Sequence, residues 1–443
     1  MARDKMPRTY RWLVSYMRYL YEKIFFKDVY YLNTQYVPTK GTPVLVVSDY
    51  QNSINDAISI LLSFRDRRVI FLARKGAFAF FPLLEKFLCS IGVIKSFQRK
   101  LEGEGYEKAD YHVPTDVEKA LVEGDAVSVF PEAVHQGRHF LGAFSLDYVR
   151  MAFEAAEKEN FEKDIFILPA CNHYSEYSGL RNQALVEYGE PISLMPFYDQ
   201  YRSFPDDAIE NVNKSVRGRV QRMMLHIGDV GNYEAIDFIR QGDYGCGYAK
   251  AHGYDPGILP QKLSSDKKLV STLENVSDQD LYDDVLKYKG LLRDLGFSEK
   301  CYDEAPRIQD VVVKCIGMVI ILPLAVFCAW PALPAYFIPR LVSRKIGDKI
   351  FSGAFSFLSN ALFIFPILGM LTLVLGLPAR GVVQSIVWVV LFPYLCMFEW
   401  KYFGWVGQVM ENIHYLKHKN SIKFQDIKTL RDDLFTRLDK VLI

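Results

Sequence analysis

The chain lacks the features that identify several common classes of protein. Its 53 basic and 52 acidic residues leave a net charge of only +1, so it has no excess positive charge with which to bind a nucleic acid backbone. Its seven cysteines are scattered and without CxxC spacing, which argues against a disulfide framework or a zinc site and fits a reducing compartment. The N-terminus has no clean apolar core followed by a small-residue cleavage site, so we expect no cleavable signal peptide.

Three stretches in the C-terminal third lack charged residues altogether. They are residues 315–338, 351–379 and 381–398, and each approaches the length of about 20 apolar residues that crosses hydrocarbon. Most of the tryptophans lie in or beside them, as expected for side chains that anchor at a membrane interface. The alternative is a set of buried helices in a large soluble core, but such helices seldom stay free of charge over this length. We therefore predict an integral membrane protein with a transmembrane region over residues 311–405.

Prolines and basic residues constrain the topology of this region. Prolines interrupt the first stretch, and each removes a backbone donor that lipid cannot replace, so a kinked or re-entrant hairpin is expected there. Lys314 precedes the stretch and a basic cluster at residues 340–349 follows it, which the positive-inside rule places in the cytoplasm. The second and third stretches would then form a transmembrane hairpin, and residues 406–443 a cytoplasmic helical tail.

The first 37 residues have the composition of a basic amphipathic helix. Between residues 8 and 32, arginines and lysines interleave with tryptophan, tyrosine, leucine and phenylalanine, a pattern typical of a helix that lies in an anionic membrane surface. The alternative is a helix that packs on its own domain, because aromatic stripes also build cores. We predict an amphipathic, membrane-associated helix over residues 1–37.

Short apolar segments alternate with helical ones in the next part of the chain. The expected strands are residues 44–47, 69–72, 126–130, 165–168 and 185–188. Strands that alternate with helices of this length predict an α/β domain, with a largely parallel sheet flanked by helices, over residues 38–200. Residues 201–310 are richer in charge and are expected to form a helical accessory region.

Two polar stretches follow expected strands, at the sheet edge where ligands of open α/β folds bind. The first is DYQNSIND at residues 49–56, and the second is FPEAVHQGRHF at residues 130–140. Two polar loops at corresponding places of the sheet indicate a site more specifically than either loop alone.

The order of these motifs resembles that of the PlsC-like glycerolipid acyltransferases, a family that includes glycerol-3-phosphate and 1-acylglycerol-3-phosphate acyltransferases. The family's NHxNSxxD block corresponds to residues 49–56, its glycine-to-arginine block to GVIKSFQR at residues 92–99, and its FPEG block to residues 130–133. The segments IFILPACNHYSEY and LVEYGEPI complete a likeness that covers residues 40–200.

This resemblance implies the family's α/β fold and its reaction. In that reaction an acyl chain passes from acyl-CoA or acyl-carrier protein to a glycerol-phosphate or lysolipid hydroxyl, as a step of phospholipid biosynthesis. The acyl donor is a substrate, and no metal or bound cofactor is implied.

The sequence departs from the family pattern at the expected base. The family's histidine, which removes the proton of the acceptor hydroxyl, corresponds to Tyr50, and the aspartate that orients it corresponds to Asp56. A phenol has a pKa of about 10, so only about one molecule in a thousand is phenolate at neutral pH, and losing a general base costs about a hundred- to ten-thousand-fold in rate. In addition, Gln98 stands where the second block's arginine is expected, one place before Arg99, and Ala133 replaces the glycine of FPEG.

The resemblance implies catalytic roles for Tyr50 and Asp56 and substrate-binding roles for five further residues: Asn52, Ser53, Arg99, Glu132 and Arg138. Each has a structural alternative. Asp56 could close a helix N-terminus in a capping box, Glu132 could be a solvated loop acid, and the arginines could lie on the surface without a ligand. Three histidines are candidates for a replacement base, although each reads more simply as a loop histidine: His135, His139 and His173.

Two functions from different classes fit this pattern. The first is an acyltransferase with atypical catalysis, in which Asp56, Glu132 and Arg138 assist and another group or water takes the proton. The second is an inactive relative that binds acyl donors or lysolipids, or that scaffolds a partner lipid enzyme. A transporter is disfavoured, because the charge-free stretches offer no ion or substrate path. We expect a cytoplasmic-facing domain at a bacterial inner membrane, with membrane lipids and acyl-CoA or acyl-carrier protein as partners and no nucleic acid.

Overall fold

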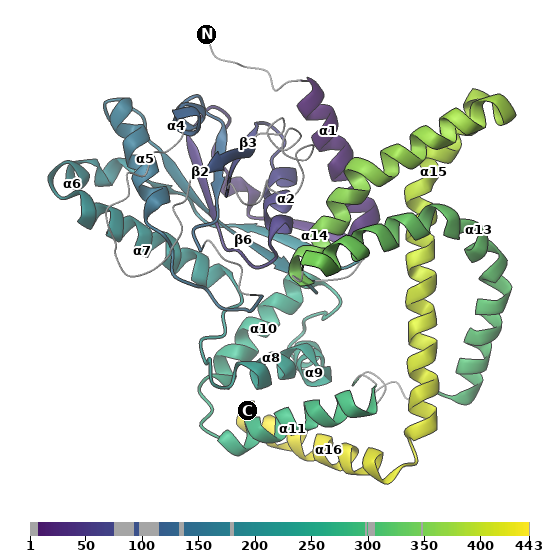
Figure 1. The fold of residues 1–443 in the computed structure, drawn as a ribbon. Coiled ribbons are helices and arrows are strands. Elements are labelled where there is room, and N and C mark those ends of the chain that lie inside the picture. Colours follow the sequence, from purple (N-terminus) through teal and green to yellow (C-terminus); the bar gives the residue numbers. More distant parts are fainter. Residues whose placement is uncertain are drawn as a thin grey trace. The chain divides into compact units, whose positions relative to one another are not determined.

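The computed structural model describes residues 8–74, 93–96, 115–132, 137–177, 181–296, 299, 306–346 and 349–442. The chain divides into two compact units, Met1–Met224 and Leu225–Ile443. The first unit contains a sheet with helices on both faces, and the described residues of the second are helical or lie in short connections (Figure 1).

An eight-stranded sheet organises the described part of the first unit. Its strand order is β1-β7-β6-β2-β5-β3-β4, and β8 pairs with β6. The strands are β1 (Asp28–Leu32), β2 (Val44–Ser48), β3 (Val69–Arg74), β4 (Val93–Ser96), β5 (Ala126–Val129), β6 (Phe166–Tyr174), β7 (Gln183–Tyr188) and β8 (Ile192–Ser193). Neighbouring strands from β4 to β6 run parallel, whereas β7 and β8 run antiparallel to β6. The predicted α/β fold with a largely parallel sheet is confirmed.

All five expected strands are present, and three further strands are not among them. β6 extends to Tyr174, well beyond the apolar segment at residues 165–168, because its second half pairs with β7. β1, β4 and β8 are the three additions. The apolar sequence pattern thus locates the central strands. The three added strands depend more on pairing with a neighbour, and their sequences show a weaker apolar pattern.

Helices cover both faces of this sheet. The helices of the first unit are α1 (Arg8–Tyr19), η1 (Leu20–Phe25), η2 (Thr34–Tyr36), α2 (Ile54–Ser63), α4 (Thr115–Val122), α5 (Asp147–Lys158), η4 (Met195–Phe197), α6 (Tyr198–Ser203) and α7 (Pro205–Met223). Cys171 of β6 donates to the Val220 carbonyl of α7, whereas Tyr174 lies against Ser59 of α2. Because side chains alternate along a strand, α7 and α2 lie on opposite faces.

The N-terminal segment is helical only as far as Phe25. The helix expected between residues 8 and 32 is corrected at its C-terminal end, because residues 28–32 form β1 and pair with β7. The two tyrosines of these residues match the aromatic pattern of the preceding helix and concealed a strand whose side chains are mostly half-buried.

The helical part of this segment packs on its own domain, which was the alternative interpretation. Met17 and Tyr21 are 0% exposed, and Arg18 donates to the carbonyls of Leu62 and Phe64 at 2.8 and 3.0 Å. Its association with a membrane stays a prediction.

The helices of the second unit are α8 (Tyr233–Gln241), α9 (Asp243–Ala251), α10 (Leu259–Leu273), α11 (Gln279–Leu295), α13 (Ile308–Ile346), α14 (Lys349–Ser359), η5 (Asn360–Ile364), α15 (Phe365–His418) and α16 (Ile422–Leu442). α16 packs against α11 and α10, and Arg437 of α16 pairs with Asp278 and Asp284 at 3.1 and 2.8 Å. The helices before α13 and after α15 therefore form one cluster.

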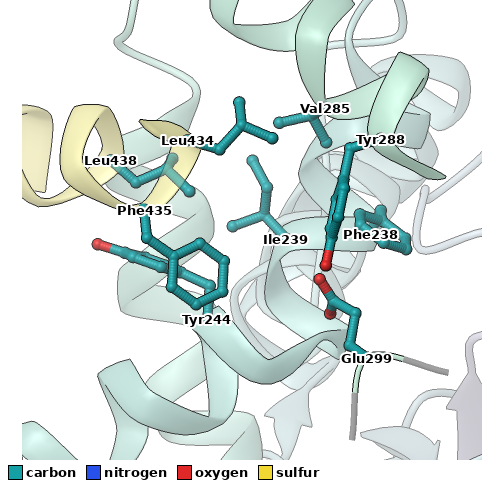
Figure 2. A pocket seen from close by; sticks show the side chains of 9 residues that line it. All are labelled: Phe238, Ile239, Tyr244, Val285, Tyr288, Glu299, Leu434, Phe435 and Leu438. Carbon is teal, nitrogen blue, oxygen red and sulfur yellow. The ribbon is translucent and has the colours of Figure 1, made fainter. Parts of the chain in front are cut away.

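A pocket lies inside this cluster, between α8, α11 and α16 (Figure 2). Its lining is mostly apolar, but the Tyr288 hydroxyl and the Glu299 carboxylate point toward one another within it (Figure 2). Glu299 also accepts the backbone N–H of Asp243 at 2.9 Å. These polar contacts connect the start of α9 to the cluster.

Among the described residues, three helical segments are long and apolar enough to cross a membrane: Ile308–Trp330, Gly353–Pro378 and Gly381–His418. Their mean hydropathies are 2.7, 2.3 and 1.9. α13 packs along α15, with the Tyr402 hydroxyl donating to the Met318 carbonyl at 3.3 Å. α15 is broken at Gly381, where φ is 78°. The C-terminal region thus contains candidate membrane-spanning helices, as the sequence predicts.

Candidate functional site

The first polar stretch forms the loop between β2 and α2. The apolar residues of β2 are 0% exposed, so the strand runs through the core and delivers residues 49–53 to one end of the sheet. Ser53 has φ 54° and ψ −131°, a conformation that costs a residue with a side chain about 1–3 kcal/mol. A loop that keeps such a residue must be held by strong local contacts.

Asp56, in the first turn of α2, supplies those contacts. Its Oδ2 accepts the backbone N–H groups of Gln51 and Asn52 at 2.9 and 2.7 Å. Burial raises the pKa of Asp56 to about 7, although these two hydrogen bonds and the Tyr174 hydroxyl act in the opposite direction. The contact resembles the capping alternative, but it fixes the loop before the helix, and the Ser53 side chain makes no capping hydrogen bond.

Glu132, at the end of the FPE motif, joins the two polar stretches. Its Oε1 accepts the backbone N–H of Tyr50 at 3.0 Å, and its Oε2 accepts that of Gly142 at 2.8 Å. Arg217 of α7 donates to the carbonyls of Leu141 and Gly142, both at 3.1 Å. Burial raises the pKa of Glu132, while its two hydrogen bonds and the Arg217 charge lower it. Glu132 is thus a half-buried bridge and not a solvated loop acid.

Tyr50 occupies the centre of the site. Its ring lies against Phe130, with centroids 5.1 Å apart, and its backbone is held by Glu132. The structure therefore places the position expected for the base beside both motifs. The side chain at that position is a phenol, which is poorly suited to accept a proton near neutral pH.

Asp49 and Asn172 join this site, although the sequence interpretation did not include them among its site residues. Asp49 Oδ1 accepts the Ser48 hydroxyl at 3.1 Å and the Asn172 backbone N–H at 2.9 Å, and the Asn172 Nδ2 donates to Ser48 Oγ at 3.0 Å. Burial and the charge of Asp56 raise the pKa of Asp49. The available sequence signal was a polar asparagine directly after the apolar run FILPAC of the strand.

A chain of hydroxyl groups lies behind Asp56. Ser59 Oγ, one turn further along α2, lies 3.0 Å from the Tyr174 hydroxyl and 2.6 Å from that of Tyr21. All three side chains are buried. The N-terminal segment thus contributes to the surroundings of the site through Tyr21.

The other expected site residues lie as follows. Arg138 is exposed on the loop after the second motif. His139 Nδ1 lies 3.3 Å from the Tyr177 hydroxyl, and His173 Nε2 lies 3.7 Å from Glu187 Oε2, on the sheet face opposite α2. Gln98, Arg99, Ala133 and His135 lie outside the described residues.

The described residues contain no group of three or more His, Cys, Asp or Glu side chains placed to hold a metal ion. The three acids of the site are instead tied to backbone and hydroxyl donors. Burial raises the pKa of each of these three acids, which is common at functional sites.

Residues 28–173 match the family model described as Acyltransferase. This segment contains β1 to β5, all but the last residue of β6, and both motifs of the site. The expected resemblance to an acyltransferase family is therefore confirmed over these residues.

A solved structure similar to part of the chain is that of the 1-acyl-sn-glycerophosphate (LPA) acyltransferase PlsC from Thermotoga maritima. The identity is 15% and the TM-score 0.33, over 49% of this chain and 77% of that chain. No curated protein sequence matches this chain.

Proposed function

We propose that the protein is a membrane-bound acyltransferase of glycerolipid biosynthesis that works with atypical catalysis. It would transfer an acyl chain from acyl-CoA or acyl-carrier protein to the hydroxyl of a glycerol phosphate or lysolipid. The observation that carries the proposal is the contact of Glu132 with the Tyr50 backbone, because it unites the family's first and third motifs in one site.

The positions of the side chains suggest how such a site would work. Glu132 fixes residue 50 and the loop around Gly142, so it is a positioning residue in this proposal. Asp56 titrates near neutral pH, which is the property that a general base requires. The acceptor's proton would pass to Asp56 or to water, and not to the phenol of Tyr50.

An inactive relative that binds acyl donors or lysolipids, or scaffolds a partner lipid enzyme, is the second candidate. The observation that favours it is the use of Asp56, whose Oδ2 is occupied by the loop amides of Gln51 and Asn52. An aspartate used in this way stabilises the loop whether or not a base stands at position 50. The binding surface could then persist without turnover.

We also propose that the acyltransferase domain faces the cytoplasm, at a bacterial inner membrane. α16 packs on α11, so both helices must lie on the same side of the membrane. This packing supports an even number of complete membrane crossings by the segment between them. The segment between α11 and α16 contains a basic cluster at residues 340–349. The positive-inside rule favours the cytoplasm for this cluster.

The test is an acyl-transfer assay on the full-length protein in nanodiscs, with labelled acyl-CoA and acyl-carrier protein as donors. Wild type is compared with Glu132→Ala, and with Glu190→Ala as a matched control, since the Glu190 side chain is exposed and pairs with Arg219 at 3.7 Å. Turnover that Glu132→Ala abolishes and Glu190→Ala preserves supports the enzyme. Ligand binding without turnover supports the inactive relative, and the absence of both contradicts the proposal.

A further inference from the structure

Three buried hydroxyl groups lie in a row that ends at Asp56. The Tyr21 hydroxyl lies 2.6 Å from Ser59 Oγ, which lies 3.0 Å from the Tyr174 hydroxyl. Tyr174 in turn interacts with the Asp56 carboxylate. Tyr21 is 0% exposed, Ser59 1% and Tyr174 8%. We call Tyr21, Ser59 and Tyr174 the hydroxyl chain.

The members of the hydroxyl chain come from three segments that are distant in the sequence. Tyr21 lies in η1, Ser59 in α2 and Tyr174 at the end of β6. η1 is a π-helical turn that directly follows α1, and such turns are rare in proteins but frequent at functional sites. The N-terminal segment is thereby connected to Asp56 through hydrogen-bonding groups.

The hydroxyl chain has a consistent direction when Asp56 is ionised. A carboxylate only accepts hydrogen bonds, whereas each hydroxyl donates one and accepts others. Asp56 Oδ2 accepts two loop amides, and Oδ1 accepts no closer donor among the described residues, so Oδ1 is open to the Tyr174 proton. Ser59 then donates to Tyr174, and Tyr21 donates to Ser59. In this order every hydroxyl proton of the chain has an acceptor.

A protonated Asp56 fits the hydroxyl chain less well. If the carboxyl proton points to Tyr174, the Tyr174 proton must turn to Ser59. Ser59 then receives protons from both tyrosines, and no acceptor for its own proton remains within the chain. Because a buried donor without an acceptor is costly, the chain favours the ionised carboxylate.

The other groups that face Asp56 have the opposite influence. Asp49 lies in the same loop and Glu132 follows β5, and both interact with Asp56 electrostatically. The remaining titratable neighbours are the two tyrosines of the hydroxyl chain. Burial and neighbouring negative charge both favour a protonated carboxyl group. The hydroxyl chain and the two loop amides therefore act against burial and these acids.

We propose that the hydroxyl chain holds Asp56 in its ionised form and so makes the N-terminal segment part of the candidate site. Tyr174 donates to Asp56, and Ser59 and Tyr21 strengthen that hydrogen bond, because a hydroxyl that accepts a hydrogen bond becomes a better donor. All three are positioning residues. The inference rests on the proposed function only in giving the ionised Asp56 a use, as the group that takes the acceptor's proton.

The test is an infrared titration of Asp56 in the full-length protein in detergent micelles, which does not require turnover. The C=O band of the protonated carboxyl group is assigned to Asp56 by its loss in Asp56→Asn, and the pH midpoint of this band is compared between variants. Tyr174→Phe removes only the hydroxyl nearest to Asp56. We expect the midpoint to rise by about one pH unit, because a hydrogen bond to the charged form is lost.

Tyr21→Phe tests the far end of the hydroxyl chain. The midpoint should rise by about 0.1–0.5 pH unit, because the chain strengthens its last hydrogen bond only in part. In the Tyr174→Phe background the same substitution should have no further effect, since Tyr21 acts on Asp56 through Tyr174. A loss of packing would not produce this dependence of one variant on the other. Tyr21→Phe also serves as the test if Tyr174→Phe does not fold.

Tyr188→Phe is the matched control. Tyr188 is also buried, and its hydroxyl is hydrogen bonded to Ser63, one turn beyond Ser59 on α2. The substitution therefore removes a tyrosine hydroxyl from the same helix but leaves the hydroxyl chain intact. It should leave the midpoint of Asp56 unchanged.

An unchanged or lower midpoint in Tyr174→Phe overturns the inference. An equal rise in Tyr188→Phe also overturns it, because a general loosening around α2 would then explain the shift. A rise confined to the hydroxyl chain, with a parallel shift in the pH profile of acyl transfer, supports both the inference and the proposed function. The same rise without any acyl transfer supports the inference and contradicts the enzymatic function.

Discussion

Buried carboxylates occur in both units of the molecule, but their surroundings differ. In the second unit, Asp266 is 3% exposed and pairs with Arg240 at 3.2 Å and with Lys262. In the first unit, Asp49 and Asp56 are 0% exposed and are held by N–H and O–H donors. Among the described residues, neither of them forms an ion pair.

This difference distinguishes a buried carboxylate that is compensated by cations from buried carboxylates that are compensated by neutral donors. A cation compensates much of the hydration that a buried carboxylate loses, whereas neutral donors compensate less, and burial then raises the pKa. Raised pKa values at Asp49, Asp56 and Glu132, gathered at one end of a sheet, are typical of binding and catalytic sites. Both carboxylate oxygens of Asp266, by contrast, are paired with a cation.

Removing a cation from the second unit should have the largest effect. Arg240→Ala leaves the buried Asp266 with only Lys262, so we expect the free energy of unfolding of this unit to fall by about 3 kcal/mol or more. Denaturant unfolding of the full-length chain in detergent measures it. Lys289→Ala breaks a pair with Glu234 that is exposed, at 3.5 Å, and should cost no more than about 1 kcal/mol. Equal losses of unfolding free energy in Arg240→Ala and Lys289→Ala would show that burial does not decide how much these ion pairs contribute to stability.

Removing the acceptor at Asp56 should have the next largest effect. Asp56→Ala leaves the N–H groups of Gln51 and Asn52 without an acceptor, at about 1–3 kcal/mol for each buried group, so we expect a loss of about 2–4 kcal/mol in the first unit. Asp56→Asn retains an oxygen and should cost less than about 1 kcal/mol in the same denaturant experiment. An equally large loss in Asp56→Asn would mean that the negative charge, and not the acceptor, holds the loop.

The pH dependence of stability should distinguish the two units further. The pKa of Asp56 is raised to about 7 in the folded state, above its value of about 4 in an unfolded chain, so the folded state binds more protons. The contribution of Asp56 to stability is therefore highest at low pH and falls as pH rises, by about 2 kcal/mol between pH 4 and pH 6. Asp56→Asn should flatten the curve for the first unit in unfolding experiments across this range. An unchanged curve would show that Asp56 titrates normally.

The smallest expected effect concerns the backbone of the site. Ser53→Gly removes the side chain that makes φ 54° and ψ −131° unfavourable, while glycine loses more conformational freedom on folding. We expect a gain of about 0.5–1 kcal/mol in the first unit, measured by the same unfolding experiment. Destabilisation would mean that the Ser53 side chain itself stabilises the loop.

The central part of the fold was predictable because its strands are apolar, short and separated by helices, which is a local property. β1 was not, because its residues, Asp28–Leu32, are aromatic and only half-buried, and their pairing with β7 is decided by segments distant in the sequence. The same is true of α16, whose docking on α11 joins two segments that the sequence showed as separate domains.

The candidate site was predictable in its residues but not in its contacts. The motifs identify Tyr50, Asp56 and Glu132, yet the bridge from Glu132 to Gly142 depends on the path of the loop that Arg217 holds. Asn172 was missed because it reaches the site only through the pairing of β6 with β2. Such contacts depend on tertiary geometry, which a local pattern does not contain.

The most direct test of the central claim replaces the side chain at position 50. Acyl transfer from labelled acyl-CoA and acyl-carrier protein is measured for wild type, for Tyr50→His, and for Tyr50→Phe, which keeps the ring contact with Phe130. The predicted result is a rate for Tyr50→His about a hundred- to ten-thousand-fold above wild type, with Tyr50→Phe close to wild type. Turnover of wild type as fast as that of Tyr50→His, lost in Tyr50→Phe, would contradict the account, because the phenol would then be the working group.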